Sequence, residues 1–238
     1  TPTKIARIRS AEYTSNPRLF SDEALSVDVW ISPEQLVTEY VERLIRYPGA
    51  LQVLTFAAGR LRLVGVRAGG SAPLVGHPIR MLRDHLPDVE VRVVAVYRDG
   101  RSLEPGAELV LKEDDEVFFL AERDQVRRVM SELRKEDNPA KRVVIAGGGS
   151  IGFRLARMLE KTHHVKVIER DPKRARHISE VLEHAIVLHG DAADEELLIE
   201  ENIDSADVFA ALTNSEEANV LSAMLAKRLG AKKVMALI

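Results

Sequence analysis

A short apolar run that ends directly in a glycine-rich turn is the feature that most constrains how this chain can fold. Arg142–Ala146 reads RVVIA, and a continuous run rich in β-branched residues is typical of a parallel strand buried on both faces. The turn GGGSIG follows at 147–152, and apolar side chains recur at helical spacing as far as Leu159. Strand, glycine turn and helix in this order predict the first unit of an α/β fold with a parallel sheet.

The alternation of strands and helices continues to the end of the sequence. Further strands are expected at Val165–Ile168, Ala185–Leu188, Val208–Leu212 and Val234–Ile238. Helices are expected between them, from Pro172 with Asp171 as N-cap, at Asp194–Glu201, and at Glu216–Leu229 with Gly230 beyond its end. Such a series predicts a Rossmann-like parallel sheet with right-handed crossovers, one strand short of a complete six-stranded domain.

The middle of the chain has many strand signals and few helical ones. Strands are expected at Leu61–Val66, Val91–Tyr97, Leu109–Leu111 and Val117–Ala121, and helices at Ile79–Leu86 and Asp124–Arg134. This pattern predicts a small α+β domain with helices on one side of a mainly antiparallel sheet. The charged stretch Lys135–Pro139 ends a helix and marks the boundary with the C-terminal domain.

The first fifty residues resemble the end of another domain. Strands are expected at Lys4–Ile8 and Val27–Ile31, and Ser32 with Pro33 forms a strong helix start. The helix is expected from Pro33 to Arg46 and carries a wide apolar stripe from Leu36 to Ile45. Two interpretations of the stripe stay open, because it packs either against the core of the same chain or across a dimer.

A short internal match links the two ends of the chain. Met235–Ile238 (MALI) resembles Ile5–Ile8 (IARI), and the sequence begins with Thr1 rather than Met. The chain therefore reads as a piece of a tandem repeat that starts and ends at equivalent points. We expect three segments: the end of a preceding Rossmann-like domain at 1–50, the α+β domain at 51–138, and a truncated Rossmann-like domain at 139–238.

Composition excludes several classes of function. The 34 Lys and Arg residues against 37 Asp and Glu residues give a net charge of −3, which argues against a general nucleic-acid surface. The absence of cysteine removes disulfides and thiolate chemistry, and the seven histidines show no metal-ligand spacing. No apolar run approaches the roughly 18 residues of a membrane span, so direct membrane insertion is not expected.

The glycine turn has the pattern of a phosphate-binding loop. Gly147 allows the tight turn after the strand, Gly149 lets the main chain approach a pyrophosphate, and Gly152 lets the helix pack close to the sheet. The N–H groups of Ser150 and Ile151 lie at the helix N-terminus, where partial positive charge favours anions. A purely structural glycine turn is the alternative interpretation.

An acidic residue after the second strand predicts which nucleotide the site takes. Glu169 can hydrogen-bond the ribose hydroxyls of an adenosine and would repel a 2′-phosphate, which favours NAD(H) or adenine nucleotides over NADP. Arg170 weakens this preference, because a neighbouring arginine can receive a 2′-phosphate.

Two more candidates follow strands at the edge where open α/β sheets place their ligands. They are Asp191 with Ala192 after the third strand and Thr213 with Asn214 after the fourth. For each pair an ordinary turn or helix cap is an equally good interpretation.

These features together resemble a known family. Gly147–Gly152, Glu169, the run Gly190–Ala192 and the pair Thr213-Asn214 are similar to the N domain of the regulators of potassium conductance (RCK_N, also called KTN). The middle region resembles the matching C-terminal module (RCK_C or TrkA-C). The stretches that carry the closest likeness to the TrkA family are Asp28–Leu36, Arg46–Ala50, Leu74–Pro78 and Ala95–Gly100.

The resemblance implies a cytoplasmic regulatory subunit of a Trk-type potassium uptake system that binds NAD(H) or ATP/ADP. Family members form dimers that build a ring on a membrane-embedded channel or transporter subunit and gate it. By resemblance, the glycine turn would hold phosphates, Glu169 the ribose, and Asp191 would lie near the adenine.

Two other classes of function fit the sequence less well. An NAD-dependent oxidoreductase needs an acid or base opposite the nicotinamide, and no pattern in the middle region supplies one. A DNA-binding redox sensor needs a basic recognition helix, which the sequence lacks. Hence we expect a ligand sensor that is not an enzyme.

Overall fold

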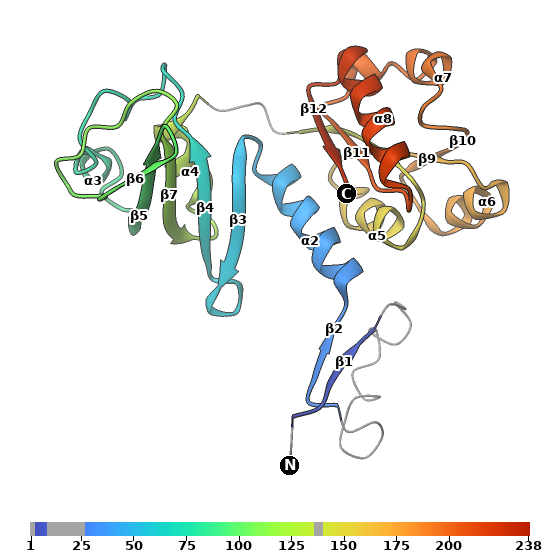
Figure 1. The fold of residues 1–238 in the computed structure, drawn as a ribbon, viewed down its shortest axis with the longest axis horizontal. Helices are drawn as coiled ribbons and strands as arrows, with labels where there is room; N and C mark the ends of the chain where they lie inside the picture. The colour runs from blue at the N-terminus through green and yellow to red at the C-terminus, as the bar shows by residue number, and fades with distance from the viewer. Residues whose placement is uncertain (1–2, 9–26, 136–139) are drawn as a thin grey trace. The chain divides into compact units, whose positions relative to one another are not determined.

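In the computed structural model, residues 3–8, 27–135 and 140–238 are described. The chain divides into two compact units, residues 1–42 with 140–238 and residues 43–139. Figure 1 shows the elements of each unit along the chain. The division into three segments at residues 50 and 138 stays a prediction.

The C-terminal part contains a five-stranded sheet in the order β10-β9-β8-β11-β12, and every ladder in it is parallel. This is the Rossmann-like α/β fold that the sequence predicts. Its strands are β8 (Arg142–Ala146), β9 (His164–Glu169), β10 (Ile186–His189), β11 (Val208–Ala211) and β12 (Lys233–Ala236). Its helices are α5 (Ser150–Leu159), α6 (Pro172–Val181), α7 (Glu195–Glu200) and α8 (Glu216–Arg228), with a short 3-10 turn at Ile203–Ser205.

The two central strands explain why the sheet forms. Apart from Arg142 at its start, β8 is buried along its length, and all four residues of β11 are buried. The chain passes from β8 outward to β9 and β10, then crosses to β11 on the other side of β8. The strand order therefore reverses beside β8, and such a switch point is where open α/β sheets bind ligands.

Near the N-terminus, β1 (Ile5–Arg7) and β2 (Val29–Ile31) form a two-stranded parallel sheet. Helix α2 (Pro33–Arg46) follows with the predicted bounds. The Ser32 hydroxyl accepts a long hydrogen bond from the Gln35 N–H at 3.4 Å, which is the expected N-cap. Both strands are shorter than the sequence predicts.

The middle unit contains a five-stranded sheet in the order β3-β4-β7-β5-β6, with antiparallel ladders throughout. Its strands are β3 (Ala50–Phe56), β4 (Leu61–Arg67), β5 (Val91–Arg98), β6 (Arg101–Leu103) and β7 (Glu116–Glu122). Its helices are α3 (Met81–His85) and α4 (Val126–Leu133), with a 3-10 turn at Ala57–Gly59. Helix α4 packs on β4 and β7, as expected for an α+β domain.

Three details of this unit differ from the sequence prediction. Strands β3 and β6 were not expected, and the strand expected at Leu109–Leu111 is wrong, because only Val110 pairs there, in an isolated bridge with Pro78. The bridge is held by the Leu111 N–H, which donates to the His77 carbonyl at 3.1 Å, and by the Ile79 N–H, which donates to the Leu109 carbonyl at 3.0 Å. No helix among the described residues is long and apolar enough to cross a bilayer.

Candidate functional site

The glycine turn lies at the carboxyl end of β8, and two of its glycines are required by the conformation of the chain itself. Gly147 has φ +100°, and its N–H donates to the Ile168 carbonyl at 2.8 Å. A Cβ on Gly147 would lie 3.0 Å from the Thr213 nitrogen. A Cβ on Gly152 would collide with the Gly147 carbonyl oxygen. Packing alone therefore explains Gly147 and Gly152.

Gly149 is different, because nothing in the chain requires a glycine there. It has φ −69° and ψ −169°, an extended conformation that any residue adopts. A Cβ at this position would meet no atom closer than Nη1 of Arg174, at 4.0 Å. The residue precedes Ser150, where α5 begins with its free N–H groups. The turn thus leaves space beside the helix N-terminus on the side where an anion would approach.

Glu169 is the last residue of β9, which matches the predicted strand end, and its buried side chain reaches the glycine turn. Its Oε2 atom accepts a hydrogen bond from the Gly148 N–H at 2.8 Å, and its Oε1 accepts one from the Asp171 N–H at 2.8 Å. A carboxylate has about four acceptor positions, so each oxygen retains capacity for another donor. The side chain therefore holds the turn to the start of α6 and can still accept from a ribose hydroxyl.

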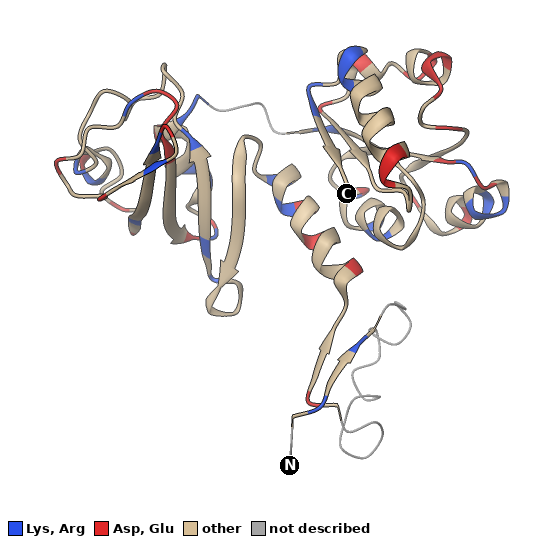
Figure 2. Cartoon of the chain, in the orientation of Figure 1, with Lys and Arg blue, Asp and Glu red and all other residues tan. Residues whose placement is uncertain are grey.

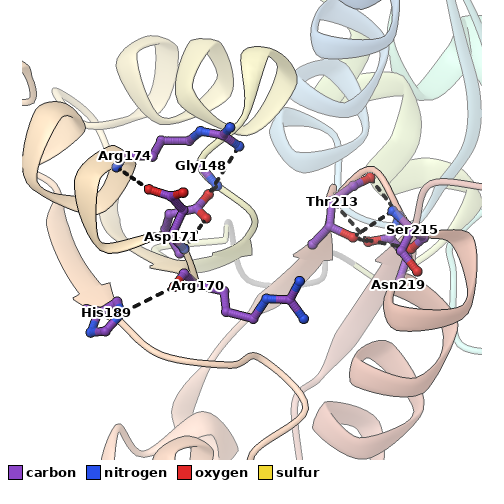
Figure 3. Close-up of polar contacts among 9 residues, drawn as sticks. Gly148, Arg170, Asp171, Arg174, His189, Thr213, Ser215 and Asn219 are labelled. Atoms are coloured by element: carbon purple, nitrogen blue, oxygen red, sulfur yellow. Dashed lines mark hydrogen bonds and ion pairs between the residues drawn. The ribbon is translucent and has the colours of Figure 1, made fainter.

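Asp171 caps α6, which confirms the prediction that it is a cap. Its Oδ1 accepts from the Arg174 N–H at 2.8 Å, and this hydrogen bond is the main cause that lowers the pKa of the carboxyl group. The neighbouring Arg170 uses its carbonyl to pair with His189 Nε2 at 3.2 Å. Figure 3 shows the Arg170 side chain pointing away from the Asp171 cluster, over the sheet edge.

The other side of the switch point is the turn after β11, which contains Thr213 and Asn214. Thr213 donates from its N–H to Asn219 Oδ1 at 2.8 Å, and its hydroxyl donates to the same oxygen at 2.7 Å (Figure 3). Asn214 is exposed, and the Ser215 hydroxyl caps α8 by accepting from the Ala218 N–H at 3.2 Å. The structure thus brings Thr213 next to Gly147, and Asn214 lies on the same turn.

Asn219 is a residue of this region that the sequence analysis missed. It is buried at 1% exposure, and its Nδ2 donates to the Thr213 carbonyl at 3.1 Å and to the Leu237 carbonyl at 2.8 Å. Its only signal in the sequence was an asparagine near the start of an expected helix, which does not by itself indicate burial.

Asp191 and Ala192 lie on the turn after β10. Asp191 is exposed, and its Oδ1 accepts from the Ala193 N–H at 2.9 Å, which is the ordinary turn contact of the alternative interpretation. Ala192 is buried in a hydrophobic core with Leu198 and Phe209. Their assignment to the adenine side stays a prediction.

Charge is unevenly distributed around the sheet edge. Figure 2 shows basic residues on α6 and acidic residues at the start of α8, where Glu216 and Glu217 occupy the first turn. Of the basic residues on α6, Arg174 reaches the glycine turn, where its Nη1 atom lies 3.9 Å from Glu169 Oε2. An anion is therefore favoured on the α5–α6 side of the switch point. The described ranges contain no group of three His, Asp or Glu residues placed to hold a metal ion.

Comparison with known proteins identifies both units. The TrkA-N domain matches residues 143–238, and the TrkA-C domain matches residues 63–134. The "Trk system potassium uptake protein TrkA" of Vibrio alginolyticus is 54% identical over 239 residues, and that of Haemophilus influenzae is 45% identical over 239 residues. Each alignment covers 100% of this chain and 52% of the relative, so the chain spans about half the length of these relatives.

Solved structures share the fold at low sequence identity. The "Crystal Structure of the GsuK RCK domain" has a TM-score of 0.58 at 19% identity, covering 98% of this chain and 53% of that one. The "GsuK channel bound to NAD" has the same TM-score and identity, covering 98% of this chain and 44% of that one. At this identity the likeness establishes the fold alone.

Proposed function

Because the chain belongs to the family of proteins that combine a TrkA-C domain with a TrkA-N domain, we propose that it is a nucleotide-sensing regulatory part of a Trk-type potassium uptake system. Its curated relatives carry the name of that system. The proposed partner is a membrane-embedded potassium channel or transporter subunit, reached from the cytoplasmic side. The proposed assembly is a homo-oligomer in which dimers build a ring.

The observation that carries the nucleotide site is the free space beside Gly149. A structural glycine turn accounts for Gly147 and Gly152, but it gives no reason for a glycine at a position with ordinary φ and ψ and open surroundings. Close approach of a phosphate to the main chain gives that reason. The N–H groups of Ser150 and Ile151 at the start of α5 would then bind the phosphate oxygens.

The proposed ligand is NAD(H) or ATP/ADP, which share an adenosine with adjacent phosphates. A protein with a similar fold is described as bound to NAD. In this chain Glu169 would accept from the ribose while it keeps its bonds to Gly148 and Asp171. Asp191, Ala192, Thr213, Asn214 and Arg170 would line the rest of the sheet edge.

The proposed output is a shift among conformations of the assembly and not a chemical reaction. A ligand moves such an equilibrium only by the difference in its affinity for the two states. The membrane subunit would read that shift as a change in potassium flux. The bound nucleotide supplies binding energy to this process and is released unchanged.

Equilibrium titration with NAD⁺, NADH, ATP and ADP tests the proposal. We expect at least one of them to bind, and we expect the Gly149→Ala and Gly149→Asp variants to lose binding, because a side chain fills the space for the phosphate. Gly106→Ala is the matched control, since Gly106 also has open surroundings but lies on a turn of the other unit.

Two results would contradict this proposal. One is unchanged affinity in Gly149→Asp with a normal unfolding temperature. The other is consumption of NADH by the protein in the presence of an aldehyde or a 2-hydroxy acid, which would favour an oxidoreductase instead.

A further inference from the structure

The Arg174 side chain reaches from the first turn of α6 to the glycine turn. Its Nη1 atom lies 3.9 Å from Glu169 Oε2 and 4.0 Å from the position that a Cβ on Gly149 would occupy. Figure 3 shows the guanidinium group above Gly148. Arg174 is therefore next to the space in which the phosphate of the proposed ligand would lie.

A series of hydrogen bonds links the main chain of Arg174 to the glycine turn. Its N–H donates to the Asp171 carboxylate at 2.8 Å, and the Asp171 N–H donates to Glu169 at 2.8 Å. Glu169 in turn accepts from the Gly148 N–H at 2.8 Å. This chain of hydrogen bonds couples the position of Arg174 to that of the glycine turn.

The guanidinium group has donors to spare for a ligand. The distance of 3.9 Å to Glu169 is an ion pair but is too long for a hydrogen bond. Its side chain is 54% exposed, so it can swing by the short distance that a direct contact requires. A planar guanidinium also matches two oxygens of a phosphate at once.

The carboxylate of Glu169 makes a nearby cation necessary. A phosphate beside Gly149 would otherwise lie close to a buried negative charge, and two like charges at that distance repel. The Nη1 atom of Arg174 lies within 4.0 Å of both the carboxylate and the Cβ position of Gly149, so its positive charge offsets that repulsion.

Resting on the nucleotide site proposed above, we propose that Arg174 is a side-chain phosphate ligand that closes over the glycine turn. The recognised class is a nucleotide phosphate joined to adenosine, whether it comes from ADP, ATP or a dinucleotide. The main-chain N–H groups hold one face of the phosphate, and the guanidinium holds the opposite face. Adenosine without phosphate gains nothing from Arg174.

Binding of ADP, NADH and adenosine to the full chain and to Arg174→Gln tests this inference. The variant should bind ADP and NADH about tenfold more weakly, which corresponds to the loss of one charge-assisted contact, and adenosine with unchanged affinity. The affinity of Arg174→Lys for ADP and NADH should lie between those of the wild type and Arg174→Gln, because lysine keeps the positive charge but cannot donate to two phosphate oxygens from one planar group. Arg176→Gln is the control, since Arg176 lies on the same helix at 84% exposure and pairs only loosely with Glu180 at 3.7 Å.

The outcomes separate the two proposals. If the unaltered chain binds no adenine nucleotide, the proposed function fails, and the role of Arg174 fails with it. If the chain binds ADP or NADH, and Gly149→Asp abolishes that binding while Arg174→Gln leaves it unchanged, only the role of Arg174 is wrong. An equal loss for adenosine and ADP would also overturn it, because a contact to the ribose or a change in the turn would then be responsible.

Discussion

At the scale of single residues, buried carboxylates connect neighbouring elements of this fold by accepting hydrogen bonds from main-chain N–H groups. Glu169 joins the glycine turn to α6. Glu160, at the end of α5, accepts from the N–H groups of Glu183 and His184 at 2.9 Å each. Burial raises the pKa of the Glu160 carboxyl, but these hydrogen bonds outweigh it and leave the pKa lowered. The ionised form of Glu160 therefore stabilises the fold.

Asp207 gives the clearest test at this scale. Its Oδ2 accepts from the Lys141 and Arg142 N–H groups at 2.7 and 2.9 Å, and its Oδ1 pairs with Lys232 at 2.7 Å. Burial opposes ionisation, yet these contacts lower the pKa of Asp207 from 3.8 to about 2. A carboxyl group with a lowered pKa stabilises the fold above pH 3.8, and this contribution is lost as the pH falls through about 2.

We expect Asp207→Asn to lower the free energy of unfolding at pH 7 by about 2 kcal/mol. The gap in unfolding free energy between variant and wild type should shrink as the pH falls below 4 and close below pH 2, where the wild-type carboxyl is protonated in the folded state as well. Urea unfolding of both proteins across this pH range measures the difference in unfolding free energy. A gap that does not change with pH would show that charge is not the cause.

At the scale of elements, the start of α8 is tied to the neighbouring strands by Asn219. Its side-chain amide forms hydrogen bonds with the turn after β11 and with the Leu237 carbonyl beyond β12. Three segments that are distant in the sequence thus depend on one side chain with 1% exposure. Thr213 lies next to Gly147, so Asn219, which holds Thr213, also supports the candidate site.

Asn219→Ala should lower the free energy of unfolding by roughly 2 kcal/mol, because it leaves buried main-chain groups without partners. Asn219→Asp is the sharper variant, since it can still accept from the Thr213 N–H but can no longer donate to the Leu237 carbonyl. Thermal unfolding measures the loss of stability, and nucleotide titration measures the effect on the candidate site. Full stability in both variants would show that water replaces the lost contacts.

At the scale of the whole molecule, the two compact units have separate cores and separate polar anchors. In the middle unit, Arg98 pairs with Asp115 through two contacts of 2.8 Å, and the Asp115 side chain is fully buried. The Lys112 main-chain N–H donates a third hydrogen bond to the Asp115 carboxylate at 2.8 Å. Mutations in separate units without shared partners should act independently.

Asp115→Asn should destabilise the middle unit by roughly 3 kcal/mol, because Arg98 is left without its buried counter-charge. Nucleotide affinity should not change. The control is Asp88→Asn, which breaks a similar bidentate pair with Arg128 at the surface and should have little effect. Chemical unfolding and nucleotide titration of both variants test this, and a loss of nucleotide affinity in Asp115→Asn would show that the units are coupled.

Local patterns in the sequence predicted much of the fold. Helix α2 and strand β8 have the predicted bounds, and the ends of the other Rossmann-like strands differ from the prediction by one or two residues, because buried parallel strands and capped helices have strong local signals. The strands β3 and β6 were missed. Neither has a strong local pattern, and each forms because a neighbouring strand offers an open edge.

The sequence by itself determined the order of strands and helices in the Rossmann-like sheet, the glycine turn at the end of β8, and the caps at Ser32 and Asp171. These depend on residues near one another in the chain, so periodicity and residue type suffice to predict them. Only the tertiary structure decided that Gly149 is free of packing demands, that Glu169 holds the turn, and that Arg174 lies beside it. Those properties depend on distances between segments that are remote in sequence, and no local pattern encodes such distances.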